Sequence, residues 1–318
     1  NGIIRVADLA REGGDDRALR RSAERGIMVR LARGRFLEAG EWNVLDPDEK
    51  YRAQVRAFAE TTRTVQVFSH WSAAALWGIP IVGVWPSAIH VTVNPTSGQR
   101  STRRVVRHLA SLRDDEVVQR DGLFVTSPLR TVVDLARTAR FETGVAVVDF
   151  AIARHRKDRD PALHVEHGLV IEAADQLANQ RGVRRLRRVG EFADGRSGSA
   201  GESFSRVQIA RAGLPAPDLQ VEVIDREGRT WHTDFGWKDS ALLGEFDGMA
   251  KYTRNRYLQG REVAEVVIEE KLREDAIRLA TGVEWFAGRG RSHPTFIDLS
   301  DCSCLQVFDA SDSEADGG

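Results

Sequence analysis

The chain has 318 residues, a formal net charge of −1 at pH 7 and a mean hydropathy of −0.36. This length exceeds what one ordinary core supports, so we expect two or three domains, and near-zero charge confines any nucleic-acid surface to a local patch. The only cysteines, Cys302 and Cys304, exclude a disulfide framework or a four-ligand zinc site. Without a long apolar run or a signal-peptide pattern, the sequence predicts a cytoplasmic protein with no membrane partner.

Residues 1–37 predict a small DNA-binding unit. Ile4–Glu12 has helical spacing, Asp15 or Asp16 caps a second helix over Arg17–Arg25, and Gly26 ends it. The stretch IMVRLARGRFL then alternates as two strands around residues 32–34. Helix, turn, helix and hairpin are typical of a winged helix-turn-helix domain, which we place at residues 1–65.

Arginines concentrate in this unit. Their guanidinium groups suit phosphate contacts and bidentate bonds to guanine, and the alternative is an arginine-rich solvated face. The candidate DNA contacts are Arg17, Arg20, Arg21, Arg25, Arg30, Arg33 and Arg35.

Residues 66–140 predict an α+β scaffold. Ser69 and Ser127 can cap helices, and strands are expected in AIHVTV, VVRHL and the hairpin EVVQRDGLFVT. His70, His90 and His108 are interpreted as structural residues rather than ligands. The N-terminal unit resembles the DNA-binding domain of AbiEi-type antitoxins. The resemblance continues through SHWSAAALWGIP at 69–80 and SPLRTVVDLAR at 127–137. That resemblance implies promoter DNA and a cognate toxin as partners.

Residues 141–195 predict a polar, helical connector. RGVRRLRRVG at 181–190 either follows a DNA backbone or is a solvated helix face. The Gly/Ser-rich stretch 194–201 predicts a boundary before a domain at 196–290, and the acidic tail 291–318 is expected to be disordered.

The last domain is organised around a hairpin in residues 233–251. A helix at Ser203–Ala212 precedes strands Leu219–Ile224 and Arg229–Trp237, and a helix at Glu262–Leu279 and a strand at Val283–Ala287 follow. A four-residue turn over 238–241 makes Trp237 face Leu242, which places Asp234 opposite Glu245. Asp247, two residues further, shares their face.

Three carboxylates on one small area repel one another, which favours a cation between them. Oxygen ligands at this spacing suit Mg²⁺ or Mn²⁺, and the alternative is a solvated face with scattered acids. Lys251 can supply a compact positive charge nearby. Asp225 and Asp239 lie in predicted turns and are excluded from the site.

The order helix, three strands, helix, strand, with Glu202, Asp234 and the EFDG run, resembles the Vsr-related branch of the PD-(D/E)XK nucleases. The resemblance implies metal-dependent cleavage of DNA, with Asp234, Glu245, Asp247 and Glu202 as metal ligands and Lys251 as a fifth catalytic group. The chain departs from the pattern at Asp247, which stands where the motif has lysine. Either the lysine has moved to Lys251 or Lys271, or a third carboxylate takes its place.

The sequence thus predicts an α+β multidomain protein with a winged helix-turn-helix, a central scaffold and a C-terminal αβββαβ restriction-endonuclease-like domain. Two functions fit: a Mg²⁺-dependent endonuclease in defence, or a non-catalytic antitoxin that represses its own promoter with a degenerate nuclease domain. An RNA target is a third reading, and a dimer is compatible with each.

Overall fold

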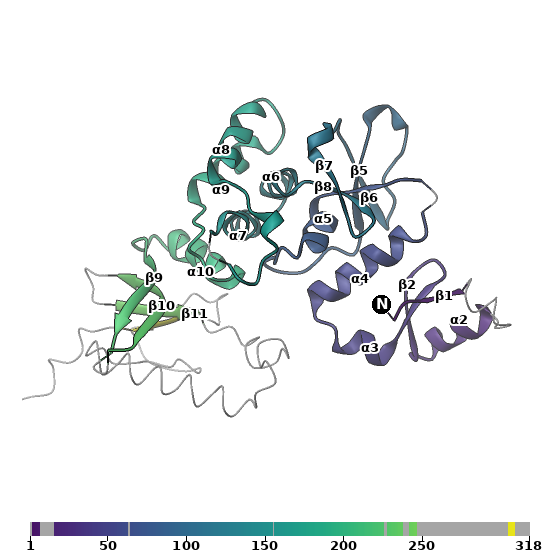
Figure 1. The fold of residues 1–318 in the computed structure, drawn as a ribbon, viewed down its shortest axis with the longest axis horizontal. Coiled ribbons are helices and arrows are strands. Elements are labelled where there is room, and N and C mark those ends of the chain that lie inside the picture. Colours follow the sequence, from purple (N-terminus) through teal and green to yellow (C-terminus); the bar gives the residue numbers. More distant parts are fainter. Residues whose placement is uncertain are drawn as a thin grey trace, which may run out of the picture. The chain divides into compact units, whose positions relative to one another are not determined.

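The computed structural model describes residues 2–6, 16–62, 64–154, 156–225, 228–237, 242–246 and 305–308. The chain divides into two units between Ala193 and Asp194 (Figure 1). Both combine helices with sheets, so the expected α+β class is confirmed.

The first unit opens with a three-stranded sheet of order β1-β3-β2. Its elements are β1 (Ile4–Arg5), α2 (Asp16–Glu24), β2 (Met28–Ala32) and β3 (Arg35–Glu38). Leu19 of α2 packs with Met28 and Phe36 of the hairpin in a small core. Helix α2 ends where Gly26 adopts a φ of 75°, which a glycine tolerates without strain.

The prediction of a helix beginning at Ile4 was wrong. Ile4 and Arg5 pair antiparallel with Phe36 and Arg35, because strand β3 offers a free edge to the start of the chain. Val6 is helical, as expected, and the rest of that predicted helix, residues 7–12, lies outside the described residues.

Two helices follow this sheet, α3 (Ala39–Val44) and α4 (Pro47–Ala59). Asp46 caps α4: its side chain accepts from Glu49 N at 2.9 Å, and Glu49 Oε2 accepts from Asp46 N at 2.8 Å. Helix α4 contacts both β2 and α5.

The second sheet has the order β6-β5-β4-β8-β7, with the pairs β5/β6 and β4/β8 parallel. Its strands are β4 (Val67–Phe68), β5 (Ile89–Val93), β6 (Val105–Leu109), β7 (Val117–Arg120) and β8 (Leu123–Thr126). The strands expected around residues 88–93, 105–109 and 116–126 are therefore confirmed.

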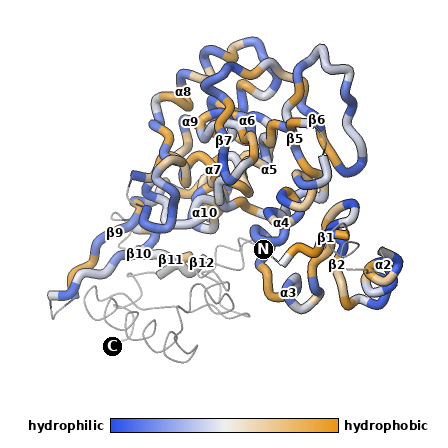
Figure 2. Tube along the Cα trace, turned by 45° about the vertical axis from the view of Figure 1, so that its right-hand side comes forward, coloured by the Kyte–Doolittle hydropathy of each residue, from blue (hydrophilic) through white to orange (hydrophobic). Residues whose placement is uncertain are grey.

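Helices pack against this sheet and against one another. They are α5 (His70–Trp77), α6 (Pro128–Thr138), α7 (Phe141–Ile152), α8 (His167–Gln176) and α9 (Val183–Phe192). Hydrophobic residues, orange in Figure 2, gather on the interior elements, whereas α2 is mostly hydrophilic. Every residue of α7 from Glu142 to Ile152 is buried, between α6 and α9. The expected polar connector is thus wrong for α7, which belongs to the core.

The second unit contains α10 (Ala200–Arg211) and a four-stranded antiparallel sheet of order β12-β11-β10-β9. The strands are β9 (Asp218–Ile224), β10 (Thr230–Trp237), β11 (Leu242–Phe246) and β12 (Leu305–Phe308). Strand β12 pairs with β11, so the expectation of a disordered tail was wrong for these four residues. The predicted elements at 262–279 and 283–287 lie outside the described residues.

Candidate active site

The β10–β11 hairpin forms with the register expected from its turn length. Trp237 pairs with Leu242, and Phe235 pairs with Gly244. One further step places Asp234 opposite Glu245, on the same face of the sheet. Asp234 Oδ2 accepts a hydrogen bond from Phe246 N at 2.8 Å, which holds this carboxylate beside strand β11.

Glu202 is fixed at the N-terminus of α10. The Ser199 side chain caps the helix by accepting from Glu202 N at 3.1 Å, so α10 begins earlier than the expected Ser203. Glu202 Oε2 accepts from Gly198 N at 2.6 Å, which turns the carboxylate back over the cap. A Cβ at Gly201 would overlap the ring of Phe246, so this glycine allows α10 to approach β11 closely.

Gln220 joins two of the carboxylates, although no sequence pattern marks it as a site residue. Its Nε2 donates to Glu202 Oε2 at 3.0 Å and to Asp234 Oδ1 at 3.5 Å. Its φ of 50° is left-handed although it lies within strand β9, a conformation that costs on the order of 1–3 kcal/mol. Strain at a residue that contacts two candidate acids favours a positioning role.

Electrostatics connect the same groups. Burial, followed by the negative charge of Asp234, raises the pKa of Glu202 to about 7. Glu245 is buried as well, with 5% of its surface exposed. Burial and the charge of Asp234 both disfavour the ionised form of Glu202, and a divalent cation bound nearby would offset that cost.

This donor set fits a hard divalent cation in chemistry, because carboxylate oxygens are the ligands that Mg²⁺ and Mn²⁺ prefer. Glu202, Asp234 and Glu245 are the described residues that would hold it. Within the described ranges, however, no group of three or more His, Cys, Asp or Glu side chains is placed so that it could hold a metal ion. Asp247 and Lys251 lie outside those ranges, so their predicted roles stay predictions.

Asp225 is a structural turn residue, as expected. Its carboxylate accepts from Arg229 N at 2.7 Å and from Trp231 Nε1 at 2.9 Å, which anchors the turn between β9 and β10. Asp239 lies outside the described residues.

Replacing Gln220 separates its two effects on stability. Leucine removes the amide and keeps the backbone strain, whereas glycine removes both. We expect Gln220→Leu to lower the free energy of unfolding by about 2–3 kcal/mol and Gln220→Gly by about 1 kcal/mol, because hydrogen bonds to charged groups exceed the strain. Urea unfolding measures both. A Gln220→Gly protein more stable than the wild type would contradict the positioning role.

The seven arginines predicted to contact DNA differ in solvent exposure. Six of the seven are exposed: Arg17, Arg20, Arg21, Arg25, Arg30 and Arg33. Arg35 is instead half-buried, and its Nε donates to Glu60 Oε2 at 2.7 Å, the same oxygen that Arg5 contacts at 2.8 Å. Arg35 is therefore the least accessible of the seven predicted DNA contacts.

The arginines of α9 largely serve the fold. Arg185 donates to the carbonyl of Ala139 at 2.8 Å, Arg187 pairs with Asp175 at 2.9 Å, and Arg188 stacks over Phe141. These contacts favour the solvated helix face over a DNA-following surface.

Three histidines that the sequence suggested were separate structural residues lie together in the first unit. The rings of His70 and His108 stack with centroids 3.4 Å apart, and His90 Nδ1 lies 3.0 Å from His108 Nε2. His70 has a φ of 51°, and its Nδ1 contacts Ser69 Oγ at 3.0 Å. Ser69 therefore occupies the N-cap position of α5 without a side-chain cap bond.

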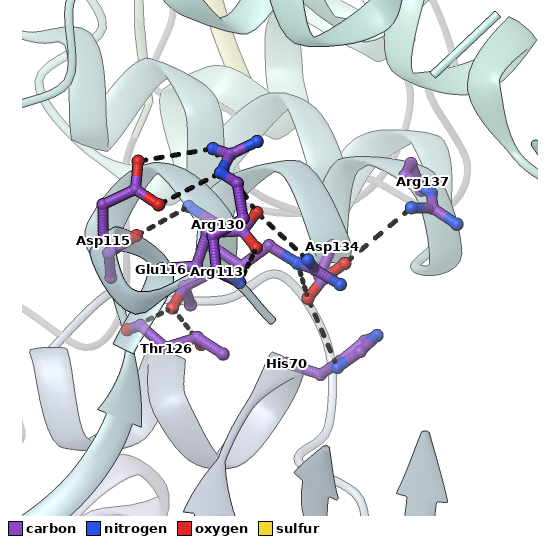
Figure 3. A network of polar contacts seen from close by, with 10 residues as sticks. His70, Arg113, Asp115, Glu116, Thr126, Arg130, Asp134 and Arg137 are labelled. Carbon is purple, nitrogen blue, oxygen red and sulfur yellow. Dashed lines mark hydrogen bonds and ion pairs between the residues drawn. The ribbon is translucent and has the colours of Figure 1, made fainter. Parts of the chain in front are cut away.

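A charged network lies beside the histidines (Figure 3). Buried Asp134 accepts from Arg130 at 2.9 Å and lies 3.8 Å from His70 Nδ1. Burial, with the neighbouring cations, lowers the pKa of His70 well below its usual range, so this contact joins a carboxylate to a neutral imidazole. Burial also lowers the pKa values of His90 and His108 to about 4. The described residues around these rings include no group placed to hold a metal ion, and the stacking of the rings beside α5 and the sheet is typical of a packed core.

The first unit carries an arginine-rich helix and hairpin. In the second unit Asp234 and Glu245 face each other on neighbouring strands, and Gln220 links Asp234 to Glu202 of α10. No protein-family model matches the chain. It is 30% identical over 237 residues to the uncharacterized proteins Rv2248 and MT2308 of two Mycobacterium tuberculosis strains, covering 69% of this chain and 80% of each relative. The chain belongs to the same protein family as Rv2248 and MT2308.

The crystal structure of the RV2827C protein from Mycobacterium tuberculosis is similar at 16% identity and a TM-score of 0.35. The match covers 70% of this chain and 79% of that one. Across the described part of the chain, no helix has the length and apolar character that crossing a bilayer requires.

Proposed function

We propose that the protein is a metal-dependent DNA endonuclease whose N-terminal winged helix-turn-helix directs a nuclease-like domain to DNA. The convergence of Glu202 and Asp234 on the amide of Gln220, with Glu245 opposite Asp234, is the observation that carries the proposal. Its context would be defence or a toxin-antitoxin pair.

Each residue has a defined task in this mechanism. Asp234 and Glu245 would hold a divalent cation on the face of β10 and β11, and Glu202 would complete its ligands from α10. The cation, when bound, supplies Lewis-acid polarisation of the scissile phosphate and a more acidic water. Gln220 keeps two carboxylates at a fixed spacing, and the hydrogen bond from Phe246 N orients the Asp234 carboxylate.

The N-terminal unit would supply the DNA affinity. Exposed arginines on α2 and on the β2–β3 hairpin suit contacts to phosphates and guanine edges. The Glu60 contact leaves Arg35 as a residue that secures the hairpin to α4.

A cleavage panel tests the proposal. We expect the full-length protein to nick or cut supercoiled plasmid with Mg²⁺ or Mn²⁺ and to be inactive in EDTA. Calorimetry with Mg²⁺ alone should detect a site, because carboxylate oxygens are the ligands that Mg²⁺ prefers. Metal binding without cleavage would contradict the nuclease assignment, and absence of metal binding would contradict the metal site.

A non-catalytic antitoxin-like repressor is the second candidate. Asp247 at the position of the motif lysine favours it. Tight binding to the protein's own promoter, without metal uptake or cleavage, would support this alternative.

A further inference from the structure

One stretch of the first unit carries positive charge without any compensating acid. Residues 61–113 contain no Asp, Glu or Lys, in a chain whose net charge is −1. The arginines of this stretch are Arg63, Arg100, Arg103, Arg104, Arg107 and Arg113. Most of them fall in or beside the connection between β5 and β6.

Backbone geometry gives this connection a defined shape. Asn94 caps the 3₁₀ turn Pro95–Ser97 by accepting from Thr96 N at 2.9 Å. Thr102 N then donates to the carbonyl of Val105 at 2.8 Å, which closes a tight turn. Arg103 and Arg104 are its two central residues, so their side chains start from the tip.

Arg107 secures the turn from β6. Its Nη1 donates to the carbonyl of Arg100 at 2.8 Å, its Nε donates to Gln99 Oε1 at 3.1 Å, and its backbone N donates to Ser101 Oγ at 2.9 Å. These acceptors are neutral, so the turn is held without cancelling its charge.

Three arginines are presented by this scaffold. Arg100, Arg103 and Arg104 are exposed, and no described residue hydrogen-bonds or ion-pairs with their guanidinium groups. Three other exposed arginines of the unit are ion-paired. Arg113 pairs with Asp115, Arg154 pairs with Glu166, and Arg187 pairs with Asp175.

We propose that residues 99–104, the arginine turn, form a second phosphate-contacting surface for duplex DNA, separate from α2 and the β2–β3 hairpin. Unpaired guanidinium groups on a preformed turn bind phosphate oxygens with little ordering cost. This surface would contact the phosphate backbone of the DNA, and it would therefore add affinity without base specificity. The inference rests on the DNA-binding half of the proposed function and does not depend on cleavage.

The test is a triple variant, Arg100→Gln, Arg103→Gln and Arg104→Gln, in the full chain. Fluorescence anisotropy with a labelled 30-base-pair duplex measures its affinity at several salt concentrations. We expect binding at about 0.1 M salt to weaken at least about tenfold and the salt-dependence slope to fall by about 2–3, since each lost phosphate contact changes the slope by about 0.9. Thermal unfolding should be unchanged, because the side chains are exposed.

A matched control removes the same charge elsewhere in the unit. The triple variant Arg113→Gln, Arg154→Gln and Arg187→Gln loses three arginines that are already ion-paired. Its affinity for the duplex should change by less than about threefold. Equal losses in the two variants would indicate a general charge effect and overturn the proposal.

Further outcomes separate this inference from the proposed function. If Arg20→Gln with Arg21→Gln weakens binding while the arginine-turn variant does not, the turn is excluded and the winged-helix role stands. A wild-type protein that binds no duplex DNA at low salt would overturn both. If the arginine-turn variant binds double-stranded RNA more weakly than the wild type but binds duplex DNA equally well, the assignment of this surface to DNA is overturned.

Discussion

Replacing Asp234 by Ala is expected to reduce Mg²⁺-dependent cleavage by about a thousandfold or more, the effect typical of removing a main source of transition-state charge stabilisation. Asp234→Asn tests the charge more directly, because the amide oxygen can still accept from Phe246 N. Both variants should bind duplex DNA as tightly as the wild type, since the arginines of α2 belong to the other unit.

The control for this experiment is Glu222→Gln. Glu222 is an exposed acid on the neighbouring strand β9, and its loss removes the same charge. Its cleavage rate should match that of the wild type. Undiminished cutting by the Asp234 variants would exclude the hairpin as the active site, whatever nuclease activity remained.

The second large effect is a loss of stability in mild acid, caused by the buried His70 and His90 and the half-buried His108. Burial lowers the pKa of His90 from its usual 6.5 to about 4, and His108 shows the same shift with Arg130 as a further cause. The unfolded chain therefore binds more protons than the folded chain between pH 6.5 and pH 4. Stability is complete above pH 6.5 and falls as the pH drops through this window.

The expected magnitude follows from the shift. At about 1.4 kcal/mol per pKa unit, acidification from pH 7 to pH 4 lowers the free energy of unfolding by about 3 kcal/mol for His90 alone. The stacked rings titrate together, so the three contributions do not simply add. The positive charges of Arg130 and Arg137 also oppose protonation of His70. Burial raises the pKa of Asp134, and this shift offsets part of the loss in unfolding free energy at low pH.

Urea midpoints at pH 7, 5.5 and 4.5 measure this effect. We expect His108→Gln to flatten the pH dependence, because one imidazole is removed and its neighbours lose a repelling partner. His232→Gln, which removes an exposed histidine of β10, serves as the control and should leave the profile unchanged. A steep acid transition that persists in the His108 variant would assign the sensitivity to other groups.

Local rules predicted the parts of the structure that depend on neighbouring residues. The four-residue turn fixed the pairing of Trp237 with Leu242, and Ser127 caps α6 by accepting from Arg130 N. Those local rules could not predict contacts between segments that lie far apart in the sequence. Ile4 became a strand through its pairing with Phe36.

The sites show the same division. Asp234 and Glu245 could be placed together because they occupy adjacent strands of one hairpin. Gln220 could not be selected, since its role arises from a left-handed backbone angle and from contacts to α10 and β10. The histidine cluster combines residues of α5, β5 and β6, and the pairing of Arg35 with Glu60 spans 25 positions.

Strand β12 has a consequence for any shortened form of this protein. It hydrogen-bonds along β11 from Leu243 to Phe246, and so satisfies the amides and carbonyls of the strand that carries Glu245. In a chain that ended before Leu305, β11 would be an edge strand with unpaired backbone amides and carbonyls. A strand of another molecule could pair with that edge. Truncation of the acidic C-terminus would then produce self-association and aggregation even if the arginine-bearing unit remained well folded.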